Sequence, residues 1–188
     1  MGLSALRLSM QDFLRWENEQ QERHEFYRGD VFAMVGVRRV HGAVSGNLFA
    51  AFRQHLKGTP CAAFTESLKV QIADDAIVYP DVFVTCDSAD LRTDMLFKAP
   101  VLVVEVLSDS TAAYDRGLKF SLYRRLPSLR EYLLVDPEAR TVEVFRRNAQ
   151  GVFELHDQTG ADALRLDAID LTLSMAEVFD GVEPPPQE

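Results

Sequence analysis

Two carboxylates stand in apolar surroundings where a charge needs an explanation. Glu105 lies in the middle of the run VLVVEVL at residues 101–107, and Asp81 directly precedes the apolar residues 82–84. Burying a charged carboxylate costs several kcal/mol unless the group is paired, protonated or bound to a cation. The sequence therefore predicts a site that holds something positive.

A lysine and a tyrosine follow Glu105 at helical spacing. Leu118, Leu122 and Leu126 recur every four residues, which predicts a helix over residues 111–126. On that helix, Lys119 and Tyr123 share one side with Asp115, since residues four apart are neighbours. The plain alternative is an exposed ion pair between Asp115 and Lys119, worth a few tenths of a kcal/mol.

Two acids on neighbouring strands and a nearby lysine are the parts of a metal-dependent hydrolytic site. Mg²⁺ and Mn²⁺ take carboxylate and carbonyl oxygens as ligands, so Asp81, Glu105 and the carbonyl of Val106 are the predicted metal ligands. Lys119 is predicted to stabilise negative charge in the transition state or to orient the attacking water. Tyr123 is predicted to position Lys119 or the phosphate.

The rest of the chain alternates helical and strand patterns. The segment 24–34 predicts a hairpin with a turn at Gly29 and Asp30, and it places Glu25 on its first strand. Further helices are predicted at residues 10–20 and 39–57, and a short capped segment at 174–179. The predicted strands cover residues 62–72, 79–85, 101–107, 131–137, 141–146 and 151–156.

Composition indicates an ordinary globular protein. The 188 residues are 47% hydrophobic and 26% charged, which predicts a single domain at residues 1–181 and a flexible, proline-rich tail at 182–188. Apolar runs are too short to cross a bilayer, and the N-terminal residues lack a secretory pattern. We expect a cytoplasmic protein without a membrane partner. Cys61 and Cys86 lack CxxC spacing, which predicts two reduced thiols and neither a zinc site nor a disulfide.

Net charge limits the role of nucleic acid as a partner. A formal charge of −9 argues against broad capture of a polyanion, because lysine and arginine supply most of that affinity. DNA binding would need bound metal ions and a local basic face. The densest positive charge lies on the predicted helix at 39–57, with Arg38, Arg39, Arg53 and Lys57. A solvated helix face is the plainer interpretation of these charges.

The ordered set of motifs resembles a known family. Pro80-Asp81, Glu105 in VVEVLS, the trio Asp115, Lys119 and Tyr123, and EYLLVDP at 131–137 are similar to the Uma-type restriction endonucleases of the PD-(D/E)XK nuclease superfamily. The resemblance covers nearly the whole chain. It implies an α/β (α+β) fold with a restriction-endonuclease-like mixed central sheet flanked by helices.

The same resemblance implies where the catalytic residues lie. In the superfamily a lysine stands two residues after the second acid, but Leu107 occupies that position here. The resemblance therefore implies a lysine from the following helix, at Lys119. It also implies Glu25 as an accessory acid and His41 at the edge of the site. Asp109 stands where the family usually has proline.

Three functions remain open from the sequence. The first is a Mg²⁺- or Mn²⁺-dependent DNA endonuclease that uses Asp81, Glu105, Lys119, Glu25 and Tyr123. The second is a nuclease-fold protein without catalysis that binds nucleic acid or a partner protein, which Leu107 and the −9 charge favour. The third is a hydrolase of a small phosphorylated metabolite. A homodimer would suit a cut in both strands of a duplex.

Overall fold

A six-stranded mixed sheet lies at the centre of the computed structural model, which describes residues 7–34, 36, 38–65 and 67–183. Its strand order is β11 (Phe153–Asp157), β10 (Thr141–Arg147), β9 (Glu131–Asp136), β8 (Pro100–Val106), β6 (Val82–Thr85) and β3 (Ala62–Thr65). Strands β8 and β9 pair in parallel and the other neighbours pair antiparallel. The mixed α+β sheet predicted from the sequence is thus present.

The parallel pair requires a crossover connection, and this connection carries Lys119. It consists of α3 (Ala112–Tyr114), the π-helical turn η2 (Asp115–Lys119) and α4 (Phe120–Tyr123). Single π-helical turns within α-helices are rare, and those that occur frequently lie at functional sites. The predicted helix at 111–126 is therefore shorter, and it is interrupted at the residues of interest.

A second sheet lies beside the first. Its order is β2 (Asp30–Ala33), β1 (His24–Tyr27), β5 (Ala76–Val78), β4 (Lys69–Ile72) and β7 (Leu96–Phe97). The helix α1 (Met10–Glu17) packs on this sheet, with Phe13 against Phe26 and Ile77. The 3-10 turn η1 (Asp90–Arg92) lies between β6 and β7 in the chain.

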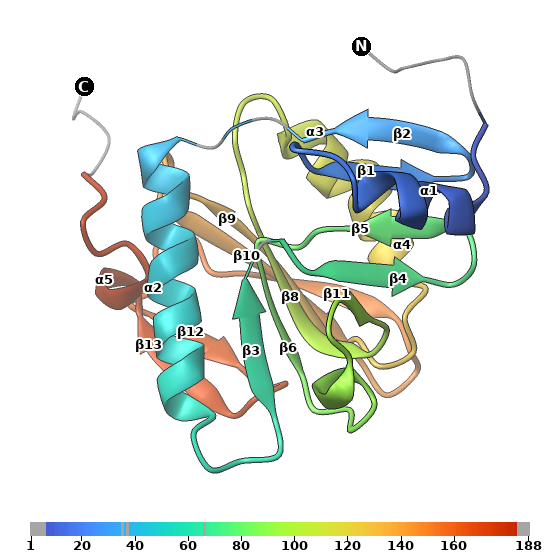
Figure 1. Ribbon diagram of the computed structural model, residues 1–188. Helices are drawn as coiled ribbons and strands as arrows, with labels where there is room; N and C mark the ends of the chain where they lie inside the picture. The colour runs from blue at the N-terminus through green and yellow to red at the C-terminus, as the bar shows by residue number, and fades with distance from the viewer. Residues whose placement is uncertain (1–6, 35, 37, 66, 184–188) are drawn as a thin grey trace.

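The two faces of the central sheet contribute to different cores. Leu102, Val104 and Val106 pack with α2 (Arg39–His55), the hairpin of β12 (Ala163–Leu166) and β13 (Leu171–Ser174), and α5 (Met175–Val178). Val103 and Leu107 pack on the other side, with α4 and the second sheet. Figure 1 shows α2, α5 and the β12–β13 hairpin on one side of the central strands, and α1 and β1–β2 on the other. Because side chains alternate along a strand, Glu105 faces the crossover helix.

Several predicted elements differ from the structure in their bounds. Tyr27 pairs with Asp30, so the first hairpin turns at Arg28 and Gly29 and not at Gly29 and Asp30. Both turn residues have positive φ, 49° and 96°, as a two-residue turn of this kind requires. The strand predicted at 62–72 is two strands, β3 and β4, which belong to different sheets. The β12–β13 hairpin was not predicted.

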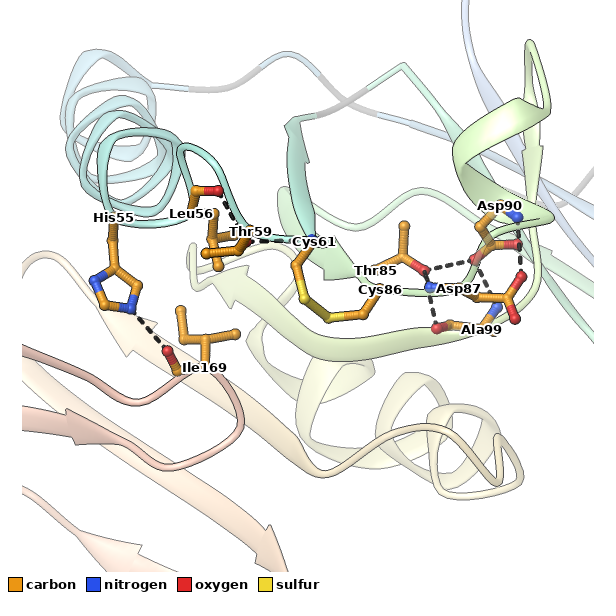
Figure 2. Close-up of a disulfide and its surroundings, with 10 residues drawn as sticks. All are labelled: His55, Leu56, Thr59, Cys61, Thr85, Cys86, Asp87, Asp90, Ala99 and Ile169. Atoms are coloured by element: carbon orange, nitrogen blue, oxygen red, sulfur yellow. Dashed lines mark hydrogen bonds between the residues drawn. A yellow bond between two sulfur atoms is a disulfide. The ribbon is translucent and has the colours of Figure 1, made fainter.

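The prediction for the two cysteines was wrong. Cys61 and Cys86 form a disulfide, with Cα atoms 4.0 Å apart (Figure 2). Ala62 of β3 pairs with Thr85 of β6, so the residues next to them lie opposite each other across the two strands. Because the cysteines are 25 positions apart in the chain, a search for short spacings could not find this cross-strand pair.

The C-terminal end packs further than predicted. Val182, the first residue of the predicted tail, is buried in the core, and its carbonyl accepts a hydrogen bond from Arg140. Residues 184–188 lie outside the described residues. Among the described residues, the structure contains no helix with the length and apolarity that crossing a membrane requires.

Candidate active site

A cleft of about 380 Å³ lies where the two sheets meet. The β1–β2 hairpin, the start of α2, the end of β8 and the crossover helix form its walls. Most of the residues predicted from the sequence line this cleft. They are Glu25, His41, Asp81, Glu105, Asp115 and Lys119, together with Val106, whose backbone carbonyl is a predicted ligand. Residues more than 90 positions apart in the chain thus share one cavity.

Glu105 and Lys119 form the centre of this group. The Lys119 Nζ atom lies 3.0 Å from Oε1 of Glu105, and both residues are buried. Tyr123 donates a hydrogen bond of 2.9 Å from its hydroxyl to the same Oε1 atom. Tyr123 is fully buried behind Glu105 and does not line the cleft. Its contact is therefore with Glu105, whereas the sequence predicted contact with Lys119 or the phosphate.

Asp81, directly before β6, contacts a backbone N–H group and a histidine ring. Its Oδ2 atom accepts a hydrogen bond of 2.7 Å from the backbone N–H of Val106, the residue after Glu105. The His41 Nε2 atom lies 3.2 Å from the same oxygen. These contacts place Asp81 beside the end of β8, on the same side of the sheet as Glu105.

Glu25 is the third acid near the lysine. Its Oε1 atom lies 3.1 Å from Lys119 Nζ and accepts a 3.0 Å hydrogen bond from the backbone N–H of Tyr79. The carbonyl of Tyr79 accepts a 3.3 Å hydrogen bond from Lys119 Nζ. The peptide groups flanking one residue, Tyr79, therefore position both the accessory acid and the amine.

Asp115 completes the surroundings of the amine. Its Oδ1 atom lies 3.7 Å from Lys119 Nζ, and its backbone carbonyl accepts a 3.0 Å hydrogen bond from Tyr132. Both Asp115 and Lys119 are buried, so the alternative of an exposed ion pair is wrong. The residues predicted to be catalytic do not include Asp115, although its position four residues before Lys119 is a usable signal.

A second set of buried polar contacts joins α1 to Tyr79, the residue that positions Glu25 and Lys119. Glu17 on α1 is fully buried and accepts hydrogen bonds of 2.9 Å from the Tyr79 hydroxyl and from the backbone N–H of His24. The His24 ring lies 3.0 Å from its other oxygen. No pattern in the sequence indicates these contacts, because the plain interpretation of α1 is a packing helix.

Burial and charge act in opposite directions on these groups. Burial raises the pKa of Glu105 well above its usual value, which Lys119 opposes and Asp81 reinforces. Burial likewise raises the pKa of Asp115. Burial alone would lower the pKa of Lys119, but Glu105, Glu25 and Asp115 together raise it well above its usual value. The three carboxylates therefore favour the protonated, positively charged form of the amine.

The donor set suits a hard divalent cation. Among the described residues, no three histidine, cysteine, aspartate or glutamate side chains come together as a metal-binding group. Asp81 and Glu105 with the carbonyl of Val106 offer two carboxylates and one backbone oxygen. Mg²⁺ usually binds in this way, through one or two carboxylates, waters and substrate phosphate, whereas a structural zinc site needs four protein ligands.

Positive charge at the cleft is sparse. Arg38, directly before α2, lines the cleft and pairs with Glu138. Arg39 instead contacts the carbonyl of Gly181, and Arg53 lies over the ring of Phe49. The basic helix face predicted from the sequence thus contributes one of these three arginines to the site.

Comparison with known proteins finds relatives over most of the chain. The profile of the Uma2 family, described as "Putative restriction endonuclease", matches residues 10–176. An uncharacterised protein of Synechocystis sp. (strain PCC 6803) is 37% identical over 177 residues, covering 94% of this chain and 93% of that protein. A second uncharacterised protein from the same organism is 28% identical over 159 residues, covering 83% and 90%.

A solved structure shares the fold. It is a crystal structure of "a putative nuclease belonging to DUF820" from Anabaena variabilis, with a TM-score of 0.75 and 20% sequence identity. The alignment covers 94% of this chain and 99% of the other. The restriction-endonuclease-like fold implied by the sequence motifs is thereby confirmed.

Proposed function

Since the chain belongs to the Uma2 family of restriction-endonuclease-like proteins, we propose that it is a Mg²⁺- or Mn²⁺-dependent endonuclease that hydrolyses phosphodiester bonds of DNA. One observation carries this proposal. Lys119 presents a buried ammonium between Glu105 and Glu25, in the cleft that Asp81 also lines. An amine beside two potential metal ligands is the arrangement that phosphoryl hydrolysis needs.

Asp81 and Glu105 would hold the metal, and the Val106 carbonyl would add a backbone ligand. When bound, a divalent cation polarises a phosphoryl oxygen and lowers the pKa of a coordinated water. Tyr123 keeps the Glu105 carboxylate in a fixed orientation through its hydrogen bond. The contact with the Val106 N–H does the same for Asp81.

Lys119 would act on the phosphate. Its Nζ atom carries three donors and already contacts Glu105, Glu25 and the Tyr79 carbonyl. A donor that turns to a non-bridging phosphate oxygen would stabilise the charge that develops there as the attacking water approaches. Glu25 and Asp115 hold the amine in place and keep it protonated.

The experiment is a nicking assay on supercoiled plasmid with Mg²⁺, Mn²⁺ or EDTA. We expect metal-dependent nicking by the natural protein and background nicking by Asp81→Asn and Glu105→Gln. Asp90→Asn is the matched control, because Asp90 is a buried acid outside the cleft that accepts hydrogen bonds from the Thr85 hydroxyl and from the backbone N–H groups of Lys98 and Ala99. Figure 2 shows Asp90 with Thr85 and Ala99. Nicking that survives in both cleft variants would contradict the proposal.

A binding protein without catalysis is the second candidate, favoured by Leu107 at the usual lysine position and by the net charge of −9. It predicts that DNA binds without being nicked under any metal condition. A hydrolase of small phosphorylated metabolites would instead cleave a small phosphodiester, such as bis-p-nitrophenyl phosphate, and leave the plasmid intact.

A further inference from the structure

One wall of the cleft is aromatic. The Phe32 and Tyr114 rings lie 6.1 Å apart between centroids, with 33° between their planes, and both residues line the cleft. Phe32 comes from β2 and Tyr114 from α3, so the pair joins the first hairpin to the crossover helix. A tilted contact at this distance is a favourable aromatic pair.

Phe32 is exposed where a core residue would be covered. Its exposure is 36%, and it lies on β2, which is the edge strand of its sheet. An exposed aromatic ring on an edge strand invites unwanted association, so such positions are usually polar. Single exposed apolar side chains are common, but this ring also lines a polar cleft and pairs with a second aromatic ring.

The aromatic wall lies next to the proposed catalytic groups. Phe32 pairs directly with Glu25 across the β1–β2 hairpin, so their side chains are neighbours on one face. Glu25 in turn lies 3.1 Å from Lys119 Nζ. Tyr114 directly precedes Asp115. A phosphate held at Lys119 would therefore have the Phe32 ring about one side chain away.

The Tyr114 hydroxyl offers a polar group at the same wall. Its oxygen is buried and no described residue meets it with good hydrogen-bond geometry, although the Glu25 carboxylate lies near; burial first, and then Glu25, raise the pKa of this phenol. A buried hydroxyl without a partner costs free energy, which a hydrogen bond to a ligand would recover. The wall thus combines two ring faces with one available donor.

We propose that Phe32 and Tyr114 bind the base of an unpaired nucleotide next to the scissile phosphate, so that the substrate is single-stranded or locally unpaired nucleic acid. This inference rests on the proposed function, because it assigns the role of the wall in phosphodiester cleavage. Every base has a π-face, so aromatic side chains bind single strands with little sequence preference. In a duplex the bases are stacked on one another, and a base must leave the stack to reach such a surface.

The test compares oligonucleotides of one sequence as a single strand, as a blunt duplex and as a duplex with one unpaired nucleotide. Each substrate carries 2-aminopurine at the same position of the sequence, which is the position of the unpaired nucleotide in the third substrate. Binding is measured in EDTA by anisotropy and by 2-aminopurine fluorescence, and cleavage is measured separately with Mn²⁺. The proteins are the natural chain, Phe32→Ala, Phe32→Leu and the control Leu155→Ala, which removes an apolar side chain 53% exposed on β11.

We expect the natural protein and Leu155→Ala to bind the single strand and the duplex with one unpaired nucleotide. In both proteins, binding should quench the fluorescence of 2-aminopurine. Loss of one stacked base should weaken binding by about 5- to 150-fold in Phe32→Ala. Phe32→Leu, which keeps an apolar side chain of similar bulk but no ring, should lose the quenching as well. Cleavage of the blunt duplex should be the slowest of the three.

Other results separate the two proposals. Metal-dependent cleavage that is equal on all three substrates and unchanged in Phe32→Ala would overturn the base-binding inference and leave the nuclease function standing. No cleavage of any substrate would overturn the nuclease function, while Phe32-dependent quenching would still support the base site. Equal affinity for free 2-aminopurine nucleotide and for the oligonucleotide would overturn the assignment to a nucleic-acid strand.

Discussion

The hydroxyl of Tyr123 donates a 2.9 Å hydrogen bond to the Glu105 oxygen that also lies 3.0 Å from Lys119. Tyr123 comes from α4 and Glu105 from β8, the strand that precedes the crossover. The crossover thus contributes two groups to one carboxylate: a neutral donor, the Tyr123 hydroxyl, and a cation, the Lys119 amine. A carboxylate with this support has little freedom to rotate, which is what a preorganised metal ligand requires.

Tyr123→Phe should therefore weaken the metal response without abolishing the fold. Removing one buried hydrogen bond to an acidic group costs about 1–3 kcal/mol of unfolding free energy. The freed Glu105 should also bind Mn²⁺ less tightly, by roughly 10- to 100-fold, as expected for the partner of a ligand. Urea denaturation measures the first effect, and the Mn²⁺ dependence of the melting temperature measures the second.

Tyr132→Phe is the matched control for this variant. Tyr132 is also a fully buried tyrosine, but its hydroxyl donates to the backbone carbonyl of Asp115. We expect a similar loss of stability with an unchanged Mn²⁺ affinity. If both variants lose Mn²⁺ affinity equally, Tyr123 has no specific role in holding Glu105.

Lys119→Met should separate turnover from metal binding. The substitution leaves Glu105, Glu25 and Asp115 buried without their cation, which typically costs about 3–5 kcal/mol. Turnover should fall because the donor to the phosphate is gone. Mn²⁺ affinity should be kept or raised, since a competing positive charge has been removed from beside Glu105.

Nicking activity and Mn²⁺-induced thermal shifts measure these two effects. Lys69→Met is the control, because Lys69 is a buried lysine outside the cleft that donates to Asn18. It should lose stability and keep the nicking rate per folded molecule. A Lys119→Met variant that loses Mn²⁺ binding would show that the amine acts in building the metal site.

Glu25→Gln tests whether this acid orients the lysine or binds the metal. The amide oxygen can still accept from the Tyr79 N–H, so we expect a stability loss of about 1 kcal/mol. Turnover should fall through the changed position of Lys119, with Mn²⁺ affinity unchanged. A loss of Mn²⁺ affinity equal to that in Glu105→Gln would instead make Glu25 a metal ligand.

The sequence predicted which charged residues meet at this site better than it predicted the contacts that support them. Glu105 and Asp81 could be found because a charge in an apolar run demands a partner. Lys119 could be found from its helical spacing after Glu105, and the resemblance to a family implies the same residue. The accessory contacts could not be found in this way. Tyr79 positions Glu25 and Lys119 through backbone atoms, which leave no trace in residue type. Its hydroxyl reaches Glu17, 62 positions earlier in the chain.

The fold shows the same division between local and distant information. Helix caps depend on neighbouring residues: Ser9, three residues before Asp12, caps α1, and Ser174, three residues before Glu177, caps α5. The division of residues 62–72 between two sheets depends on tertiary packing, as does the β12–β13 hairpin, whose leucines complete the core beneath α2. Cross-strand partners such as Cys61 and Cys86 likewise become neighbours only once β3 and β6 have paired.

The disulfide gives a last prediction that is independent of the cleft. A bridge across 25 residues removes conformational freedom from the unfolded chain, which corresponds to about 3 kcal/mol of stability. The Cys61→Ala, Cys86→Ala double variant should therefore unfold at lower urea concentration, with nicking activity retained. Dithiothreitol should lower the melting temperature of the natural protein and leave that of the double variant unchanged. If the reductant has no effect on the natural protein after full reduction is verified by thiol titration, the bridge does not contribute to stability.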